Sequence, residues 1–247
     1  MMHGCNGRMG KMITQLCKDD SRIQIVAGID ARGGLSEDYP IYEKVEDCLE
    51  EVDVIVDFSK SDAIDHLLMV CVERNIPVVL CTTGLKQETI EKIAEASRSI
   101  AILKSANMSL GINVLMKALQ EVAKKLESNN FDIEIVEKHH NQKVDAPSGT
   151  ALALADSINE VLQEKCVYNF DRSQSFTARE KKEIGISAVR GGSIPGEHEV
   201  IFAGLDEVIT IKHTAYSRMI FAKGAVLAAC FLANQKPGLY DMQDVME

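Results

Sequence analysis

The segment from Glu137 to Ala151, EKHHNQKVDAPSGTA, concentrates groups that can carry protons and bind anions. Its adjacent histidines, His139 and His140, carry imidazoles, the side chain whose ordinary pKa lies nearest to neutral pH. Lys143 adds a positive charge or a further proton. A single histidine is more often an ordinary surface residue, and no third ligand at metal-site spacing accompanies this pair. The combination instead indicates a reaction that includes a proton transfer.

The same segment opens a helix that is expected over 150–165. Ser148 follows a proline and is the expected N-cap, so the N–H groups of Gly149 and Thr150 should have no partner within the helix. The helix dipole favours a carboxylate or a phosphate at that end, and Gly149 has no side chain to block its approach. The segment therefore suits a small dicarboxylate substrate.

A second group of residues, near the start of the sequence, could bind a dinucleotide. HGCNGRMG places glycines at positions 4, 7 and 10, where the backbone must turn tightly after a strand and approach a pyrophosphate closely. The N–H groups of the following helix would face the phosphates. Only three residues precede Gly4, so we expect either a first strand shorter than the usual length of about 5–6 residues or a true start upstream of this sequence. A flexible glycine-rich tail is the alternative interpretation.

Polar residues follow the expected strands of the same region. Asp30 lies twenty residues beyond the last glycine of the loop, where a carboxylate can accept hydrogen bonds from an adenosine ribose. Arg32 could pair with a 2′-phosphate, so NADH and NADPH both fit. Thr82, Thr83 and Asn107 follow two further strands, at the edge where an open α/β sheet binds ligands. Helix capping and turn formation are the alternative roles for these three residues.

Strands and helices alternate in the first half of the chain and would position this loop. Runs rich in β-branched residues predict strands at 23–30, 52–59, 76–84 and 100–107. Helical spacing of apolar residues predicts helices at 10–19, 61–74 and 86–99. Apolar strands that alternate with amphipathic helices indicate an α/β fold with a parallel sheet covered on both faces.

The pattern changes after residue 107. A longer helix is expected at 111–127, followed by a strand at 131–139 whose period-two alternation leaves one face wet. Further elements are expected at 150–165, 184–190, 198–203, 207–213 and 219–234, the first and last of them helices. The second region is therefore predicted to be α+β with an open antiparallel or mixed sheet. The final helix is expected to pack back on the first domain.

Composition limits the class of protein. The chain has 247 residues with 46% hydrophobic and 26% charged residues, enough for a large core. Its net charge of −10 argues against nucleic acid and anionic membranes as partners. Seven cysteines without C-x-x-C spacing indicate free thiols in a reducing compartment. Without a signal segment or a membrane-spanning run, the expected location is the cytoplasm.

These motifs together resemble the signature of the 4-hydroxy-tetrahydrodipicolinate reductase (dihydrodipicolinate reductase) family of bacterial lysine biosynthesis. The His-His segment is highly specific, and the resemblance extends in the family's order through GCNGRMG, VDFSKSDA, CTTGL, SANMSLGINVL and RGGSIPGEHEVIFAG. It covers nearly the whole chain. The chain departs from the family at its amino end, where the usual first strand is lacking, and at Cys81, where a glycine is common.

The resemblance implies an activity and a domain organisation. The activity is reduction of 4-hydroxy-tetrahydrodipicolinate to tetrahydrodipicolinate, by hydride transfer from NADH or NADPH with loss of water, in lysine and diaminopimelate biosynthesis. A Rossmann-like dinucleotide-binding domain would span 1–108 and be completed by 217–247. An α+β domain at 109–216, with an open mixed sheet, would bind substrate and form a homotetramer. A hinge near residues 108 and 217 would close the two domains.

The resemblance also assigns residues. His139 would donate or accept a proton, and Lys143 would donate one. The residues expected at the substrate are His140, Lys143, Ser148, Gly149 and Thr150. The residues expected at the cofactor are Gly4, Cys5, Asn6, Gly7, Arg8, Met9, Asp30, Arg32, Cys81, Thr82, Thr83, Ser105, Ala106, Asn107 and Met108. No metal is expected.

Two alternatives remain open from the sequence. Another two-domain nicotinamide-dependent dehydrogenase, for example one acting on aspartate, would also need the glycine loop. It would not need the group of His-His, Lys and Ser-Gly-Thr. A non-catalytic nucleotide-binding sensor would bind the cofactor without turning over any dicarboxylate.

Overall fold

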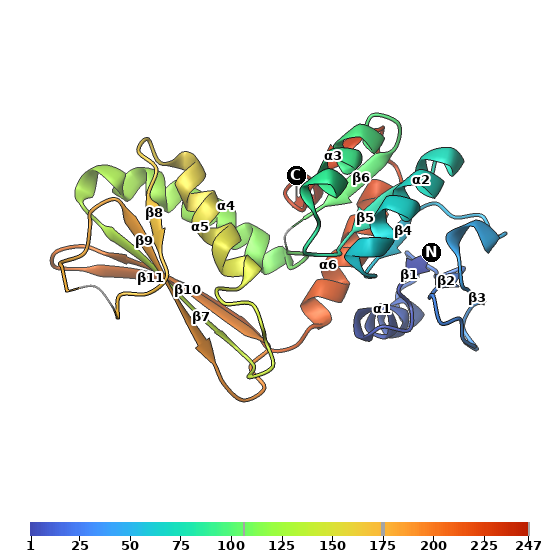
Figure 1. Cartoon of the computed structure of the whole chain (residues 1–247), viewed down its shortest axis with the longest axis horizontal. Coiled ribbons are helices and arrows are strands. Elements are labelled where there is room, and N and C mark those ends of the chain that lie inside the picture. The colour runs from blue at the N-terminus through green and yellow to red at the C-terminus, as the bar shows by residue number, and fades with distance from the viewer. Residues whose placement is uncertain (106, 174–175, 247) are drawn as a thin grey trace. The chain divides into compact units, whose positions relative to one another are not determined.

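The computed structural model describes residues 1–105, 107–173 and 176–246, and the chain divides into two compact units (Figure 1). Unit 1 consists of Met1–Leu110 and Met219–Glu247, and unit 2 consists of Gly111–Arg218. Unit 1 is therefore built from both ends of the sequence. Among the described residues, no helix is both long enough and apolar enough to cross a lipid bilayer.

Unit 1 contains a seven-stranded sheet in which every pair of neighbours is parallel. Its strands are β1 (Met2–His3), β2 (Gly28–Ile29), β3 (Ile41–Tyr42), β4 (Ile55–Asp57), β5 (Val78–Leu80), β6 (Ala101–Lys104) and β12 (Gly238–Tyr240). They lie in the order β12-β6-β5-β4-β1-β2-β3, so the order reverses between β1 and β4. Ligands of open α/β sheets bind at such a switch point, at the carboxyl ends of the strands.

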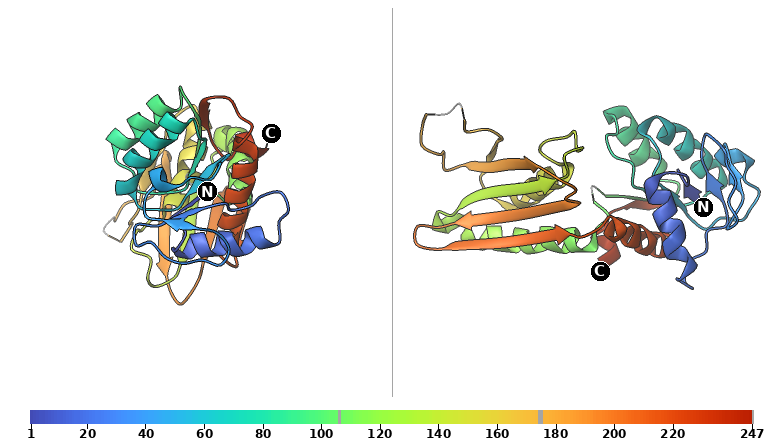
Figure 2. Two further views of the ribbon diagram at one scale, coloured as in Figure 1. Left: turned by 90° about the vertical axis from the view of Figure 1, so that its right-hand side faces the viewer. Right: turned by 90° about the horizontal axis from the view of Figure 1, so that it is seen from below.

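Helices cover both faces of this sheet, as the alternating pattern predicted. They are α1 (Arg8–Lys18), α2 (Ile64–Arg74), α3 (Gln87–Ala96) and α6 (Met219–Leu232), with short 3-10 helices at Val45–Asp47, Ser61–Ala63 and Asp244–Met246. One buried cluster of apolar side chains joins the sheet to α2 and α3, and another joins it to α1 and α6. The helices α1 and α6 lie side by side (Figure 2).

The predicted strand at 23–30 is much shorter in the structure. Only β2, Gly28–Ile29, pairs within the sheet. The neighbouring β1 offers just Met2 and His3 for pairing, so residues 23–26 have no strand beside them to extend the ladder. Two further strands of unit 1, β3 and β12, were not predicted, because two or three residues are too few to show an alternation.

Unit 2 contains a five-stranded mixed sheet in the order β11-β10-β7-β9-β8. Its strands are β7 (Asp132–His139), β8 (Val167–Asn169), β9 (Glu183–Arg190), β10 (Gly196–Ala203) and β11 (Val208–Ala215). The pairs β7–β9 and β8–β9 are parallel, whereas β7–β10 and β10–β11 are antiparallel. The sheet was predicted to be antiparallel or mixed, and it is mixed. The short strand β8 was not predicted.

Two long helices lie over one face of this sheet, α4 (Leu110–Leu126) and α5 (Gly149–Val161), and a 3-10 helix at Glu127–Asn129 follows α4 (Figure 1). Their apolar side chains form the core of unit 2 with the facing side of the strands. The helix α5 ends before the predicted residue 165, because Leu162 takes an extended conformation. Nζ of Lys165 then donates to the carbonyl oxygens of Asn159 and Glu160, at 2.8 and 3.0 Å.

Candidate active site

The strand β7 ends at His139, and its alternation decides which side chains meet. Side chains two residues apart on a strand point to the same face, and the buried face of β7 carries Ile133, Ile135, Glu137 and His139. The two isoleucines belong to the core of unit 2. Glu137 has no exposed surface and His139 is 8% exposed. A carboxylate and an imidazole therefore continue the buried face at the end of the strand.

Glu137 accepts hydrogen bonds from three separate segments. Nδ1 of His139 lies 2.5 Å from its Oε2. Arg190, which pairs with His139 in the β7–β9 register, donates to both carboxylate oxygens at 2.8 and 2.7 Å. The backbone N–H of Ser148 donates to Oε1 at 3.0 Å. Burial alone would raise the pKa of Glu137, but these hydrogen bonds outweigh it and lower the pKa to about 2.

Ser148 caps α5, as the sequence predicted. Its Oγ accepts the N–H of Ala151 at 3.1 Å and lies 3.1 Å from Nε2 of His198. A Cβ added to Gly149 would meet no atom within 4 Å, so there is open space beside the first turn of the helix. Thr150, the next residue, is half-buried.

The carboxylate of Asp145, which the sequence interpretation did not consider, lies near the first N–H of α5, that of Gly149. The pKa of Asp145 is lowered: burial would raise it, but the hydrogen bond and charge of Lys143 and the N–H of Gly149 outweigh burial. Nζ of Lys143 lies 2.8 Å from Oδ1 of Asp145. The sequence interpretation did not consider that the side chain of an acidic residue three positions before the cap can lie beside the start of the helix. The Asp145 carboxylate thus contacts two groups that were predicted to bind an anion.

Two further basic groups lie in this region. Nη2 of Arg218 lies 3.4 Å from Nε2 of His140. Arg218 was not predicted, because it is close to His140 only in the folded chain. The backbone N–H of Lys143 donates to the carbonyl oxygen of His140 at 3.1 Å, so a tight turn follows the end of β7 and brings Lys143 back toward the strand.

His198, on β10, is a second buried imidazole that the sequence interpretation left without a role. Its ring meets that of His139 edge to face, with centroids 5.1 Å apart. Burial, followed by the electrostatic influence of the neighbouring His139, lowers the pKa of His198 to about 3, so its ring is neutral at physiological pH. A Cβ at Gly196 would stand 3.1 Å from Nε2 of His139, and the glycine leaves room at that nitrogen.

In unit 1 the glycine loop adopts the close packing expected of a dinucleotide site. Gly4 has φ +80°, and a Cβ there would stand 2.8 Å from the carbonyl oxygen of Phe58. A Cβ at Gly10 would stand 2.4 Å from the carbonyl oxygen of Cys5. The N–H of Gly7 donates to the carbonyl oxygen of Gly4 at 3.0 Å. The loop therefore turns tightly from β1 into α1, and neither Gly4 nor Gly10 tolerates a side chain.

The predicted ribose acceptor lies beside this loop. Oδ2 of Asp30 accepts the N–H of Asn6 at 3.3 Å, and Oδ1 accepts the N–H of Arg32 at 3.1 Å. The helix α1 begins at Arg8 without a side-chain cap, and an uncapped helix start presents N–H groups of the kind that bind phosphate. The exposed Arg8 and Arg32 add positive charge near both features.

The carboxyl ends of β1, β4 and β5 are joined by Asp57, which is fully buried and was not predicted as a site residue. Its Oδ1 lies 2.8 Å from Nδ1 of His3 and accepts the N–H of Ser59 at 3.1 Å. Oγ1 of Thr82 donates to Oδ2 at 2.7 Å. Asp57 therefore fixes the hydroxyl of Thr82 at the crevice, whereas the neighbouring Thr83 is exposed.

The other residues predicted at the cofactor differ in what they can offer. Cys5 and Met108 have buried side chains in the core beneath α1 and α6, so only their backbone can face a ligand. Cys81 is half-buried against the same core.

Among the described residues after β6, side chains hydrogen-bond to nearby backbone groups. Oγ of Ser105 donates to the carbonyl oxygen of Asn107 at 3.1 Å, and Oδ1 of Asn107 accepts the N–H of Ser109 at 2.8 Å. This is the turn chemistry considered for Asn107 from the sequence. Ala106, also predicted at the cofactor, lies outside the described residues.

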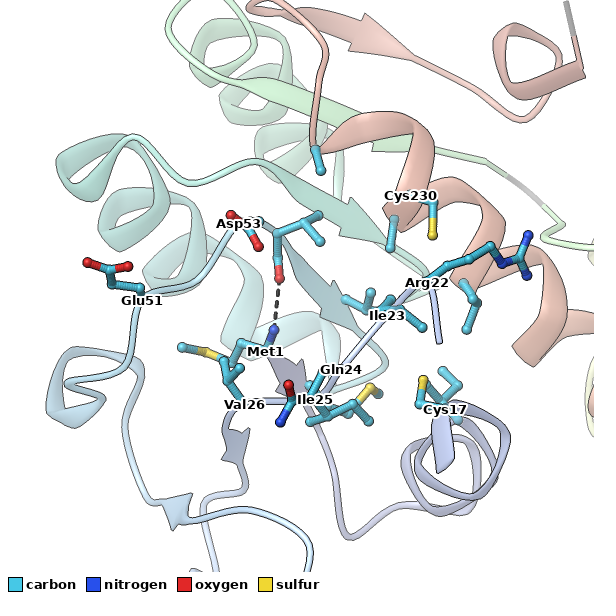
Figure 3. A pocket seen from close by; sticks show the side chains of 17 residues that line it. Met1, Cys17, Arg22, Ile23, Gln24, Ile25, Val26, Glu51, Asp53 and Cys230 are labelled. Carbon is cyan, nitrogen blue, oxygen red and sulfur yellow. Dashed lines mark hydrogen bonds between the residues drawn. The ribbon is translucent and has the colours of Figure 1, made fainter. Parts of the chain in front are cut away.

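A cavity of about 240 Å³ lies elsewhere in unit 1, beneath the starts of β1 and β4 (Figure 3). The amino group of Met1 donates to the carbonyl oxygen of Val54 at 2.8 Å at its edge. Its wall includes Cys17 and Cys230, but none of the residues predicted to bind cofactor or substrate. The cavity is at the opposite end of the strands from the glycine loop, so it is not the dinucleotide site.

Comparisons with known proteins agree with this arrangement. The family described as dihydrodipicolinate reductase, N-terminus, matches residues 1–108, and dihydrodipicolinate reductase, C-terminus, matches residues 111–246. The chain is 53% identical over 247 residues to 4-hydroxy-tetrahydrodipicolinate reductase of Caldanaerobacter subterraneus subsp. tengcongensis, covering 100% of this chain and 97% of the relative. It is 50% identical to the enzyme of that name from Clostridium tetani, covering 98% and 94%.

Solved structures share the fold. Dipicolinate-bound dihydrodipicolinate reductase from Paenisporosarcina sp. TG-14 is similar with a TM-score of 0.78 at 23% identity, covering 97% of this chain and 96% of that one. GenD2 from gentamicin A biosynthesis, in complex with NAD, is similar with a TM-score of 0.64 at 11% identity, covering 99% and 88%.

Proposed function

Because the chain belongs to the dihydrodipicolinate reductase family, it is an NAD(P)H-dependent oxidoreductase, and we propose how its residues divide the work. The reaction reduces 4-hydroxy-tetrahydrodipicolinate to tetrahydrodipicolinate with loss of water, in lysine and diaminopimelate biosynthesis. In the proposal, residues 1–108 with 217–247 bind the dinucleotide. Residues 109–216 bind the cyclic dicarboxylate.

The glycine loop and the strand ends of unit 1 fit a dinucleotide. The turn at Gly4 and the uncapped start of α1 offer backbone N–H groups to a pyrophosphate. Asp30 offers carboxylate oxygens to a ribose, and Arg32 offers positive charge to a 2′-phosphate. Thr82, held by Asp57, offers a fixed hydroxyl at the carboxyl edge of the sheet. When bound there, the reduced nicotinamide supplies the hydride for C4 of the substrate ring.

The start of α5 is the proposed anchor for the substrate carboxylates. The helix dipole and the N–H groups of Gly149 and Thr150 favour negative charge there. The basic side chains of His140 and Lys143 stand on the preceding turn and add charge-assisted hydrogen bonds. A substrate carboxylate would take the place of the Asp145 side chain, which contacts Lys143 and Gly149 in this structure.

His139 and Lys143 are the proposed proton donors. Hydride addition to the unsaturated ring leaves an electron-rich enamine, which must gain a proton to complete the reduction. Nδ1 of His139 is engaged by Glu137, so Nε2 is the nitrogen that can hold and deliver that proton. The observation that best supports this role is the 2.5 Å contact between His139 and the buried carboxylate of Glu137. The same carboxylate also accepts the N–H of Ser148, the cap of α5.

We also propose that the chain forms a homotetramer and acts in the cytoplasm. One face of the second sheet carries exposed Val208, Thr210 and Lys212 on β11, on the side away from the core. That face could meet a second copy of the chain, which is consistent with a homotetramer. The seven cysteines are free thiols, which fits the cytoplasm.

Steady-state kinetics with both cofactors tests the function. The purified chain should oxidise NADH and NADPH in the presence of enzymatically generated 4-hydroxy-tetrahydrodipicolinate, and not in the presence of aspartate or an aspartate-derived imine. Cofactor binding without turnover of any dicarboxylate would instead identify a sensor. Turnover of the aspartate-derived substrate would identify a different dehydrogenase.

A further inference from the structure

Glu137 is an unusual residue for the edge of a hydrophobic core. It has no exposed surface, and a buried charge is costly unless its partners compensate it fully. A leucine or methionine of similar size would fill the same space without that cost. The reaction itself assigns Glu137 no task, since His139 and Lys143 are the proposed proton donors. The reason for a carboxylate at this position therefore lies in what it holds.

Each oxygen of the carboxylate faces a different functional group. Oε2 accepts from Nδ1 of His139 at 2.5 Å, and Oε1 accepts the N–H of Ser148 at 3.0 Å. Arg190 donates one nitrogen to each oxygen, at 2.8 and 2.7 Å, so the carboxylate cannot rotate without breaking this fork. Arg190 also donates to the carbonyl oxygen of Asp145 at 2.6 Å, in the loop that leads to α5.

We propose that Glu137, locked by Arg190, is a positioning residue that holds the ring of His139 and the first turn of α5 at a fixed spacing, with Nε2 of His139 as the reactive nitrogen. The proposal rests on the proposed function, because it concerns the spacing between the proton donor and the anchor of the substrate carboxylates. Glu137 itself does not contact substrate.

The contact between Glu137 and His139 has two chemical consequences. A carboxylate at Nδ1 keeps the hydrogen of the neutral ring on that nitrogen, so the Nδ1–H tautomer prevails. The same negative charge stabilises the protonated ring. Two titratable groups contact His139 directly, Glu137 on its own strand and His198 on β10. Arg190 on β9 shares the Glu137 carboxylate with it, and the charge of Lys143 acts on the neighbouring His198.

The Glu137→Gln variant keeps the size of the side chain and removes its charge. We expect kcat to fall by about 10- to 100-fold, the range known for carboxylates that orient metal-binding histidines. In the pH profile of kcat, the limb at high pH, where the rate falls, should move to lower pH. Glu137→Asp keeps the charge and should restore the position of that limb, even if kcat is only partly recovered.

Nitrogen-15 NMR of histidine-labelled protein gives a readout that is independent of turnover. The His139 signal, assigned through its loss in His139→Gln, should show the Nδ1–H tautomer in the unaltered protein and a mixture in Glu137→Gln. Glu134→Gln is the matched control, because Glu134 is another carboxylate of β7 that binds arginines, Arg172 and Arg179. It should leave both the tautomer and the pH profile unchanged.

The outcomes separate this proposal from the proposed function. An Nε2–H tautomer of His139 in the unaltered protein would overturn the positioning role without any variant, including the case in which Glu137→Gln fails to fold. A folded Glu137→Gln protein with an unchanged tautomer and an unchanged pH profile would overturn it as well. Absence of turnover in the unaltered protein would instead refute the function and leave the tautomer measurement valid.

Discussion

Oγ of Ser148 lies 3.1 Å from Nε2 of His198, so the residue that caps α5 is bonded to a buried imidazole on β10. The helix start that is proposed to hold the substrate is thereby tied to the sheet at two points. One is this hydroxyl, and the other is the Ser148 N–H that binds Glu137. Both ties involve groups whose pKa values are shifted by burial and by their neighbours.

The low pKa of His198 predicts a dependence of stability on pH. An unfolded histidine takes a proton near pH 6.5, whereas His198 in the folded chain takes one only near pH 3. The unfolded state therefore binds the extra proton between these values, and the free energy of unfolding falls as pH falls. Between pH 7 and pH 5 one such group contributes a loss of about 2 kcal/mol.

Urea unfolding at these two pH values measures the loss. His198→Gln should remove most of this loss of stability. The range from pH 7 to pH 5 lies above the pH at which Glu137 gains its proton, so Glu137 does not contribute to it. His66→Gln, which alters a half-exposed histidine, is the control and should keep the slope of the unaltered protein. Equal slopes in the two variants would contradict the buried, neutral state of His198.

Loss of the proposed proton donor should affect turnover rather than cofactor binding. His139→Gln should lower kcat by about 10²–10⁴-fold, the usual contribution of a general acid. The dissociation constant of NADH, measured by fluorescence titration, should stay unchanged because the glycine loop is untouched. An unaltered kcat would remove His139 from the mechanism.

Lys143→Ala should raise KM for the dicarboxylate and also lower kcat. The substrate carboxylate would lose a charged partner, and Asp145 would remain at the start of α5 without its counter-charge. Lys124→Ala removes another lysine paired with a carboxylate, Glu121, on the surface of α4, and should change neither constant. A Lys143→Ala enzyme with normal saturation kinetics would refute the assigned role.

Asp145→Asn should lower KM, in the opposite direction to Lys143→Ala. The carboxylate of Asp145 contacts the two groups that are proposed to bind the substrate anion, so its removal frees them. A charge at a helix start contributes about 1 kcal/mol, which corresponds to about fivefold in KM. A higher KM would show that Asp145 orients Lys143 rather than competing with the substrate.

Gly149→Ala should separate binding from stability. The added methyl group would meet no atom of the described residues within 4 Å, and alanine favours a helix more than glycine does. The melting temperature should therefore be unchanged or slightly higher, while KM for the substrate rises because the methyl group enters the space beside the anchor. An unchanged KM would place the substrate carboxylate elsewhere.

The parts of the site that lie close together in sequence could be predicted from it. The Ser148 cap follows from residue types within a few positions, and so does the glycine loop. The period-two alternation of β7 also placed Ile133 and Ile135 on one face, and Glu137 and His139 continue it. The sequence did not show that Glu137 would be buried, because that depends on what covers the end of the strand.

Residues brought together by strand pairing could not be predicted in this way. Arg190 reaches Glu137 because β9 pairs with β7 in a particular register, across fifty-three positions of sequence. His198 comes from β10 on the other side of β7, and local patterning holds no information on either neighbour. The strands β3, β8 and β12 were missed for a different reason, since runs of two or three residues carry no measurable period.

The strand β12 belongs to the same sheet as β1, which lies near the other end of the chain, and the helix α6 packs on that sheet. During synthesis on the ribosome, the segment that carries the glycine loop emerges before unit 2, but the apolar side chains beneath α6 stay uncovered until residues 219–240 have been made. The contiguous unit 2 can fold before that moment. The cofactor binding proposed for unit 1 thus becomes possible only after residues 219–240 have been made, by which time unit 2 can already have folded.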